Sequence, residues 1–184
     1  HRRETLHQDI KPDNLFITST GQLKLIDFGS ACVGSLSENL TVRAGAAEYA
    51  APEYALGIAR DGRADQFSLA VTFYELLTGH YPYGDNYLAA KTPNQFRKLQ
   101  YTSACKHNPH VPLWLDAALA QALSLNPEHR YPELSEFLID LERPNTHLTL
   151  KAKPWLEQNP LLFWKVTSVL MLVLNLILLA CWMK

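Results

Sequence analysis

The N-terminal part of the chain contains two short apolar segments that predict a hairpin. These segments are Leu15–Ile17 and Leu23–Ile26, and the turn-forming residues Ser19–Gln22 lie between them. A hairpin returns the chain on itself. We therefore expect Asn14 and Asp27, which flank it, to lie close together.

The longest helical pattern covers residues 65–77. Its apolar side chains recur at helical spacing on nearly every side: Phe67, Ala70, Val71, Phe73, Tyr74 and Leu77. A helix that is apolar all round is a buried helix, and Gly79 is a typical helix stop. Shorter helices are expected over residues 93–99, 113–125 and 133–141, and residues 1–6 are expected to end a helix.

The pattern changes after Glu142. Residues 143–160 are polar and interrupted by prolines, which is typical of a linker, whereas residues 161–183 are almost wholly apolar. An apolar segment of about 20 residues is long enough to cross a bilayer as a helix. Trp164 and Trp182 lie where aromatic residues gather at membrane interfaces, and Lys165 can reach the lipid headgroups. The sequence predicts a transmembrane helix over 161–183, in contact with membrane lipid, and favours it over a buried core helix.

Composition and charge exclude only a few classes of function. The chain has 184 residues, 47% of them hydrophobic, which indicates one globular domain with an additional apolar segment. Its formal net charge of −1 gives no reason to expect a nucleic-acid partner. The scattered Cys32, Cys105 and Cys181 argue against a disulfide framework or a zinc site.

The candidate chemistry lies in the segment His7–Asn14 and in Asp27 beyond the hairpin. Phosphoryl transfer needs an acidic group beside the attacking hydroxyl, a cation beside the phosphoryl group and oxygen ligands for magnesium. Asp9 can accept the hydroxyl proton, and Lys11 can balance the phosphoryl charge. Asn14 and Asp27 can supply oxygen ligands to Mg²⁺.

These residues resemble the catalytic and magnesium loops of a eukaryotic-like (Hanks-type) Ser/Thr protein kinase of the bacterial kind. The family pattern of HRD, four residues, Asn and a later DFG is matched at His7, Asp9, Asn14 and 27–29. Lys11-Pro12 is the Ser/Thr-type continuation of that pattern. The resemblance implies ATP and Mg²⁺ as cofactors and protein Ser/Thr hydroxyls as acceptors, with Lys11, Asn14 and Asp27 at the nucleotide and metal.

Further matches imply structural roles for residues downstream. Phe28 and Gly29 open the activation segment, and Ala51-Pro52-Glu53 resembles the APE sequence that closes it. Asp65 resembles the buried aspartate of the central helix, and Arg130 resembles the arginine that pairs with the APE glutamate. The implied fold is mainly α: a kinase C-lobe over residues 1–142, with short β-hairpins at the catalytic cleft.

The resemblance also implies segments that these residues do not contain. The N-lobe of the family carries a glycine-rich phosphate loop, a strand lysine and a helix glutamate. We therefore interpret the chain as the C-terminal part of a longer product, inactive without its N-lobe. A C-terminal membrane anchor with a cytoplasmic catalytic part also resembles bacterial proteins in which a metal-dependent phosphatase domain precedes the kinase.

Two residues depart from the family pattern. Gln8 replaces the arginine that pairs with a phosphorylated activation loop in many kinases, and Ala46 stands where Ser/Thr kinases usually have threonine. Three functions therefore remain open: a membrane-anchored Ser/Thr kinase, a pseudokinase that serves as an anchored binding module, and an inactive fragment. The intact Asp9, Asn14 and Asp27 favour the first.

Overall fold

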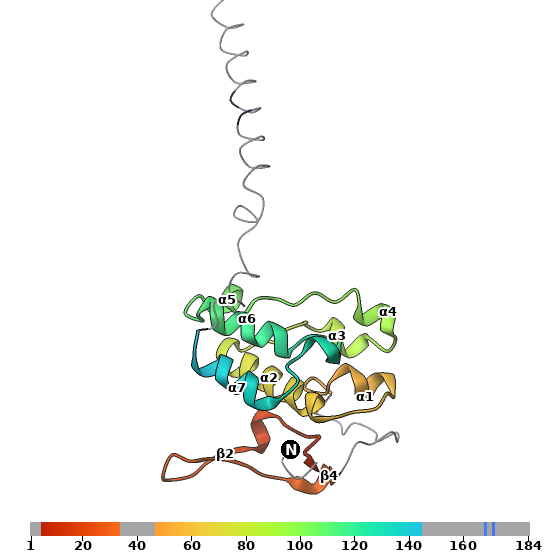
Figure 1. Ribbon diagram of the computed structural model, residues 1–184, viewed down its shortest axis with the longest axis vertical. Coiled ribbons are helices and arrows are strands. Elements are labelled where there is room, and N and C mark those ends of the chain that lie inside the picture. Colours follow the sequence, from red (N-terminus) through yellow and green to blue (C-terminus); the bar gives the residue numbers. More distant parts are fainter. Residues whose placement is uncertain (1–4, 34–46, 145–167, 169–170, 172–184) are drawn as a thin grey trace, which may run out of the picture. The chain divides into compact units, whose positions relative to one another are not determined.

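The computed structural model describes residues 5–33 and 47–144, together with Ser168 and Met171 (Figure 1). The chain divides into two units, His1–Thr146 and His147–Lys184, and all the elements below belong to the first. No helix among the described residues is long and apolar enough to span a bilayer. Apart from Ser168 and Met171, the predicted transmembrane segment 161–183 lies outside the described residues, as does most of the predicted linker 143–160, so both stay predictions.

Two small antiparallel sheets form the N-terminal part. The predicted hairpin is confirmed: β2 (Leu15–Ile17) pairs with β3 (Leu23–Leu25), with Leu15 opposite Leu25. The second sheet joins β1 (Thr5–Leu6) to β4 (Cys32–Val33). The expectation of helix was therefore wrong for Thr5 and Leu6. Their partner strand is far away in sequence, so a local pattern could not reveal the pairing.

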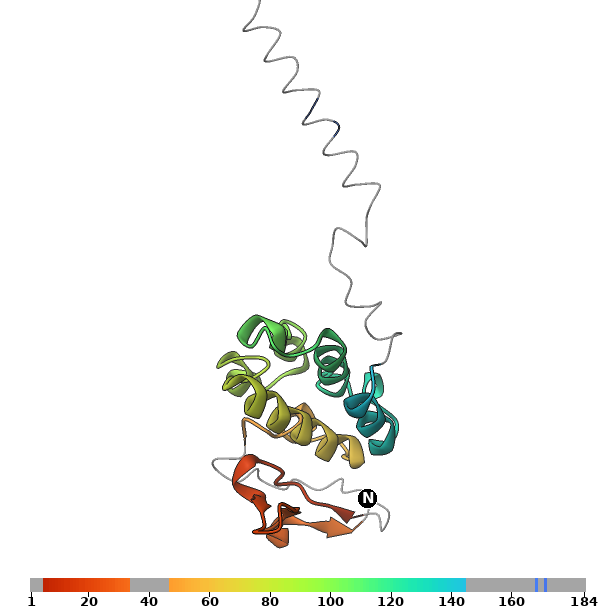
Figure 2. The ribbon, with the colours of Figure 1, turned by 90° about the vertical axis from the view of Figure 1, so that its left-hand side faces the viewer.

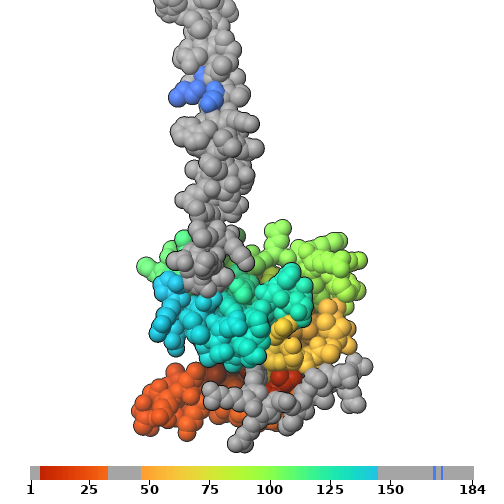
Figure 3. Space-filling model, in the orientation of Figure 1, coloured from red at the N-terminus to blue at the C-terminus, as the bar shows by residue number. Residues whose placement is uncertain are grey.

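The hairpin stands out from the helices in the space-filling view, where it is orange (Figure 3). Several of its apolar side chains are more than half exposed: Phe16 at 56%, Ile17 at 68% and Leu23 at 58%. The hairpin thus leaves part of its apolar surface exposed.

The predicted central helix is α2 (Gly62–Thr78), which begins before the predicted start at Asp65. Asp61 caps its N-terminus by accepting a hydrogen bond from the backbone N–H of Arg63 at 2.8 Å. Gly79 ends it with a φ of 71°, a left-handed conformation that glycine adopts without steric cost. The phenyl ring of Phe67 and the phenol of Tyr74 are completely buried, as the all-round apolar pattern predicted.

Several of the other helices pack against α2. It packs against β1 on one side and against α5 (Ala104–His107), α6 (Leu113–Ala122) and α7 (Leu134–Glu142) elsewhere (Figures 1 and 2). The predicted helix over 93–99 is shorter, because α4 covers only Pro93–Phe96. The pattern did not predict α1 (Pro52–Leu56), α3 (Asn86–Ala89), α5 or the 3₁₀ turns η1 (Pro12–Asn14), η2 (Phe28–Ser30) and η3 (Pro127–His129).

Candidate active site

The loop that carries Asp9 is held by its backbone. The N–H groups of His7 and Gln8 donate to the two carboxylate oxygens of Asp65, at 2.6 and 2.9 Å. Gln8 has a φ of 65°, so the chain turns sharply just before Asp9. Burial raises the pKa of the Asp65 carboxyl, and the two backbone donors oppose that shift. The first turn of α2 therefore fixes the position of the loop that carries Asp9.

Asp9, Lys11 and Asn14 form one cluster. The Lys11 ammonium lies 3.3 Å from Oδ1 of Asp9, and the Asn14 amide nitrogen donates to Oδ2 of Asp9 at 3.0 Å. The same nitrogen donates to the Asp9 carbonyl at 2.7 Å. Asp9 is only 5% exposed, and Oδ1 has no hydrogen-bond partner in the described part of the chain. The carboxylate is thus oriented by two neighbours and keeps one oxygen able to accept a proton.

The hairpin brings Asp27 back to this cluster. The N–H of Ile26 donates to the carbonyl of Asn14 at 2.9 Å, so Asp27 follows a residue bonded directly to Asn14. Asp27 adopts a left-handed φ of 60°, and its Oδ1 accepts a hydrogen bond from the N–H of Gly29 at 3.1 Å. The rings of His7 and Phe28 meet edge to face with centroids 4.8 Å apart, which ties the two loops together.

The donor atoms suit magnesium with bound phosphates. The Asn14 nitrogen is engaged with Asp9, which leaves the amide oxygen as the atom available to a cation. Mg²⁺ prefers hard oxygen ligands and is usually held by one or two protein groups together with substrate phosphates and water. Asn14 and Asp27 therefore fit the ligand set that the sequence predicted.

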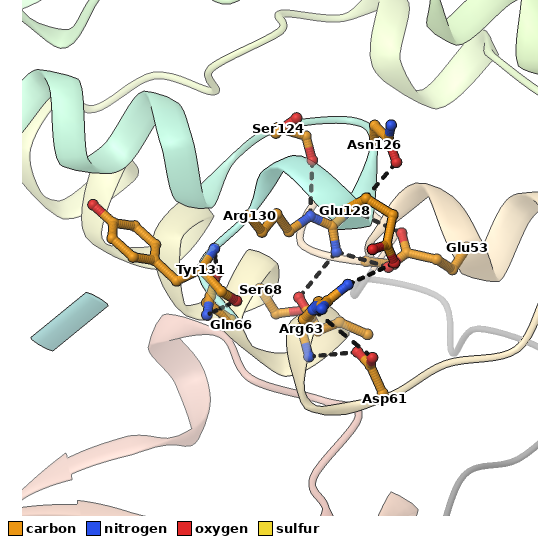
Figure 4. A network of polar contacts seen from close by, with 12 residues as sticks. Glu53, Asp61, Arg63, Gln66, Ser68, Ser124, Asn126, Glu128, Arg130 and Tyr131 are labelled. Carbon is orange, nitrogen blue, oxygen red and sulfur yellow. Dashed lines mark hydrogen bonds and ion pairs between the residues drawn. The ribbon is translucent and has the colours of Figure 1, made fainter. Parts of the chain in front are cut away.

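The predicted partners Glu53 and Arg130 form a buried ion pair (Figure 4). Two guanidinium nitrogens of Arg130 donate to the two carboxylate oxygens of Glu53, at 2.7 and 2.9 Å. Arg130 also donates to the carbonyls of Ser124 and Arg63, at 2.8 and 2.9 Å, and its guanidinium lies 4.8 Å from the ring centre of Phe67. The pair joins α1 to the start of α2, because Arg63 lies in the first turn of that helix.

Sequence reasoning missed a second link in this network. The side-chain amide of Gln66 donates to the carbonyl of Tyr131 at 3.2 Å and accepts from the N–H of Tyr131 at the same distance (Figure 4). Gln66 is only 1% exposed, so a polar side chain at a core position of α2 was the available signal. The exchange holds the residue after Arg130 against the central helix.

The structure also shows what Gln8 does instead of the usual arginine. Its side-chain amide contacts the sulfur of Cys32 in β4, beside the pairing of Leu6 with Cys32. The second departure, Ala46, lies outside the described residues.

A family model for the protein kinase domain matches residues 1–139. The chain belongs to the protein kinase family. The match includes all the site residues above, and protein kinases as a family use ATP and Mg²⁺.

Several bacterial protein kinases are similar to this chain. The serine/threonine-protein kinase PknB of Mycobacterium leprae is 34% identical over 146 residues, which are 78% of this chain and 23% of PknB. The serine/threonine-protein kinase Pkn1 of Myxococcus xanthus is 37% identical over 145 residues, 74% of this chain and 21% of Pkn1. A probable serine/threonine-protein kinase of Streptomyces coelicolor, SCO3848, is 35% identical over 147 residues, 77% of this chain and 22% of that protein. The chain thus spans less than a quarter of these relatives.

Proposed function

We propose that this chain is the C-lobe part of a Ser/Thr protein kinase that transfers the γ-phosphoryl group of ATP to protein hydroxyls. The observation that carries the proposal is the cluster of Asp9, Lys11 and Asn14, joined through the hairpin to Asp27. An idle site has no physical reason to keep a carboxylate that is only 5% exposed, because burying a charged group is costly.

The residues divide the reaction between them. Asp9 accepts the proton of the substrate Ser or Thr hydroxyl. At the same time the hydroxyl oxygen forms a bond to the γ-phosphorus of ATP, and the bond between that phosphorus and the β–γ bridging oxygen breaks. Lys11 lies beside Asp9 and balances negative charge on the transferred group. Asn14 orients the Asp9 carboxylate through its amide nitrogen, and its amide oxygen, together with Asp27, would hold the cation. Mg²⁺, when bound, offsets the charge of the phosphate oxygens.

The test is phosphoryl transfer from Mg-ATP by the natural full-length product that contains this chain. Asp9→Asn keeps the shape of the side chain but cannot take a proton, and we expect it to lower kcat by about 100-fold or more. Asp27→Ala should cause a loss that higher Mg²⁺ concentrations relieve only in part. Asp13→Asn is the matched control, since Asp13 is an exposed carboxylate of the same loop, and it should retain activity. Absence of transfer by a folded parent protein would instead support the anchored binding module.

We further propose that residues 161–183 anchor the kinase in a membrane with its catalytic part in the cytoplasm. The support is the apolar run in the sequence. Replacing Val173 and Leu176 by arginine costs about 2.5 to 3.5 kcal/mol each at the centre of a membrane helix, and should shift the protein out of the alkali-resistant membrane fraction. Lys151→Arg, in the proposed linker, should not. Equal membrane recovery of the parent, the double arginine variant and Lys151→Arg would refute the anchor.

We also propose that a phosphatase domain precedes the kinase in the same polypeptide. The full-length sequence would test this.

A further inference from the structure

Two histidines that are distant in sequence stack on each other at the end of α2. His80 follows Gly79, the residue that ends this helix, and His107 is the last residue of α5. Their ring centroids are 4.0 Å apart, and the ring planes differ by 13°. Both residues are exposed. Asp65, which holds the catalytic loop, lies at the other end of α2, about 20 Å away along the helix axis, so the pair is separate from the phosphoryl-transfer cluster.

The backbone that carries the two rings is held by other contacts. The side-chain amide of Asn108, next to His107, donates to the carbonyl of Leu77 at 2.8 Å. The hydroxyl of Tyr74 in α2 donates to the carbonyl of Thr102, just before α5, also at 2.8 Å. These bonds join α2 to the segment that contains α5, so the fold itself brings the two rings together.

A hydrogen bond fixes the tautomer of His80. Its Nδ1 lies 2.8 Å from the carbonyl oxygen of Thr78. A carbonyl oxygen can only accept, so Nδ1 carries a proton, and in the neutral ring Nε2 keeps its lone pair. Metal-bound histidines almost always donate their second ring N–H to a carbonyl, a carboxylate or water in this way. The His80 ring is therefore held in the form that binds a metal ion through Nε2.

The spacing of the two rings suits one shared ion. Imidazole nitrogens bind Zn²⁺ at about 2.0 to 2.1 Å, which places two nitrogens on one tetrahedral ion about 3.4 Å apart. Because the ring centroids are 4.0 Å apart, a small tilt of the rings toward each other brings their nitrogens to that spacing. Both rings are exposed, so the tilt displaces water instead of packed side chains.

The ligand atoms select the class of ion. The rings offer none of the hard oxygen atoms that Mg²⁺ prefers, whereas imidazole suits Zn²⁺, Cu²⁺ and Ni²⁺. Lys106, beside His107, is exposed, so solvent and salt weaken its repulsion of a cation. Within the described part of the chain, no group of three or more His, Cys, Asp or Glu side chains could hold a metal ion. The pair therefore supplies two ligands, and water supplies the others.

We propose that His80 and His107 together bind one divalent transition-metal ion, such as Zn²⁺ or Cu²⁺, through one nitrogen of each ring. The bound ion cross-links the end of α2 to α5. This inference does not rest on the proposed kinase function, because the two histidines are remote from Asp9 and Asp27.

The experiment titrates the full-length protein with Cu²⁺ or Zn²⁺ in excess Mg²⁺, which occupies sites built from oxygen ligands. Calorimetry measures the affinity, and pulsed electron paramagnetic resonance of the Cu²⁺ form counts the imidazoles bound to the ion. We expect one site with two imidazoles. His80→Gln and His107→Gln should each weaken binding at this site at least about tenfold and leave at most one imidazole on the ion. Zn²⁺ should slow amide hydrogen exchange in α5 of the parent protein but not of these two variants.

Two variants control for other histidines and for charge. His129→Gln removes an exposed histidine of η3, and Lys106→Gln removes the charge beside His107. Both should keep the signal of two imidazoles, and circular dichroism checks that every variant folds. A site of unchanged affinity in both His80→Gln and His107→Gln, or a parent signal with only one imidazole, would overturn the metal site. Neither result would bear on phosphoryl transfer, which is measured separately.

Discussion

The ion pair between Glu53 and Arg130 allows a quantitative test of how the lobe is held together. Both side chains are buried, with exposures of 2% and 0%. Removing one partner of a buried pair leaves the other charge uncompensated and typically costs about 3 to 5 kcal/mol. The two single variants should nevertheless differ, because Arg130 has more contacts than Glu53.

Glu53→Leu leaves the Arg130 guanidinium with the carbonyls of Ser124 and Arg63 and with the ring of Phe67. We expect it to cost about 3 kcal/mol, the lower end of the range. Arg130→Met leaves the Glu53 carboxylate buried and also leaves the two carbonyls without this donor. We therefore expect about 5 kcal/mol, the upper end.

The double variant separates the pair from the other contacts of Arg130. It contains no buried charge from this pair but still lacks the donor to Ser124 and Arg63. We expect it to cost about 3 to 4 kcal/mol, less than Arg130→Met alone because no buried charge is left uncompensated, instead of the sum of about 8, a coupling of about 4 to 5 kcal/mol. Unfolding in urea, followed by circular dichroism, measures these values. With a slope of about 2 kcal/mol per molar, Arg130→Met should lower the midpoint by about 2.5 M.

The neighbouring ion pair of Arg63 and Glu128 is the control. Its atoms approach to 2.6 Å, closer than in the buried pair, but Glu128 is 76% exposed. Glu128→Gln should therefore cost at most about 1 kcal/mol. If this variant destabilised the protein as much as Glu53→Leu, or if the double variant equalled the sum of the two singles, burial would not be the source of the effect.

Three further predictions concern other parts of the lobe. Asp116 accepts hydrogen bonds from the hydroxyls of Tyr101 and Ser103, both at 2.7 Å, and from the N–H of Ala104 at 2.6 Å. Asp116→Ala should lower the free energy of unfolding by about 3 kcal/mol and speed amide hydrogen exchange in α5. Burial, and then the Asp116 carboxylate, raise the pKa of Tyr101, so its contribution to stability is fully present below about pH 10 and is lost as the pH rises above it. Tyr101→Phe should flatten the alkaline fall in unfolding free energy, and an unchanged slope would contradict this assignment. Because Gln8 supplies no cation for a phosphorylated loop, phosphatase treatment of the full-length kinase should leave most of its transfer activity, and loss of most of it would show the reasoning to be wrong.

The sequence predicted those features that depend on nearby residues or on contiguous motifs. The hairpin around Ser19–Gln22 and the central helix ending at Gly79 have local signals, namely turn residues and an all-round apolar pattern. The cluster of Asp9, Lys11 and Asn14 lies within one short loop, so its members had to be close.

The features that the sequence did not predict depend on partners far along the chain. Thr5 and Leu6 form a strand only because β4 lies beside them. Gln66 is satisfied by Tyr131, and Ala104 at the start of α5 is bonded by the Asp116 side chain. No local propensity encodes such pairs, and a single sequence contains no covariation that would reveal them.

The anchoring of the catalytic loop explains why Gln8 can replace arginine without moving Asp9. The position of the loop depends on the backbone N–H groups of His7 and Gln8, which any residue other than proline supplies to Asp65. Asp65 is in turn fixed by α2, whose first turn is bonded through the Arg63 carbonyl to Arg130. The side chain at position 8 is therefore not needed to position the loop. Changing it alters what the loop can bind more than where the loop lies.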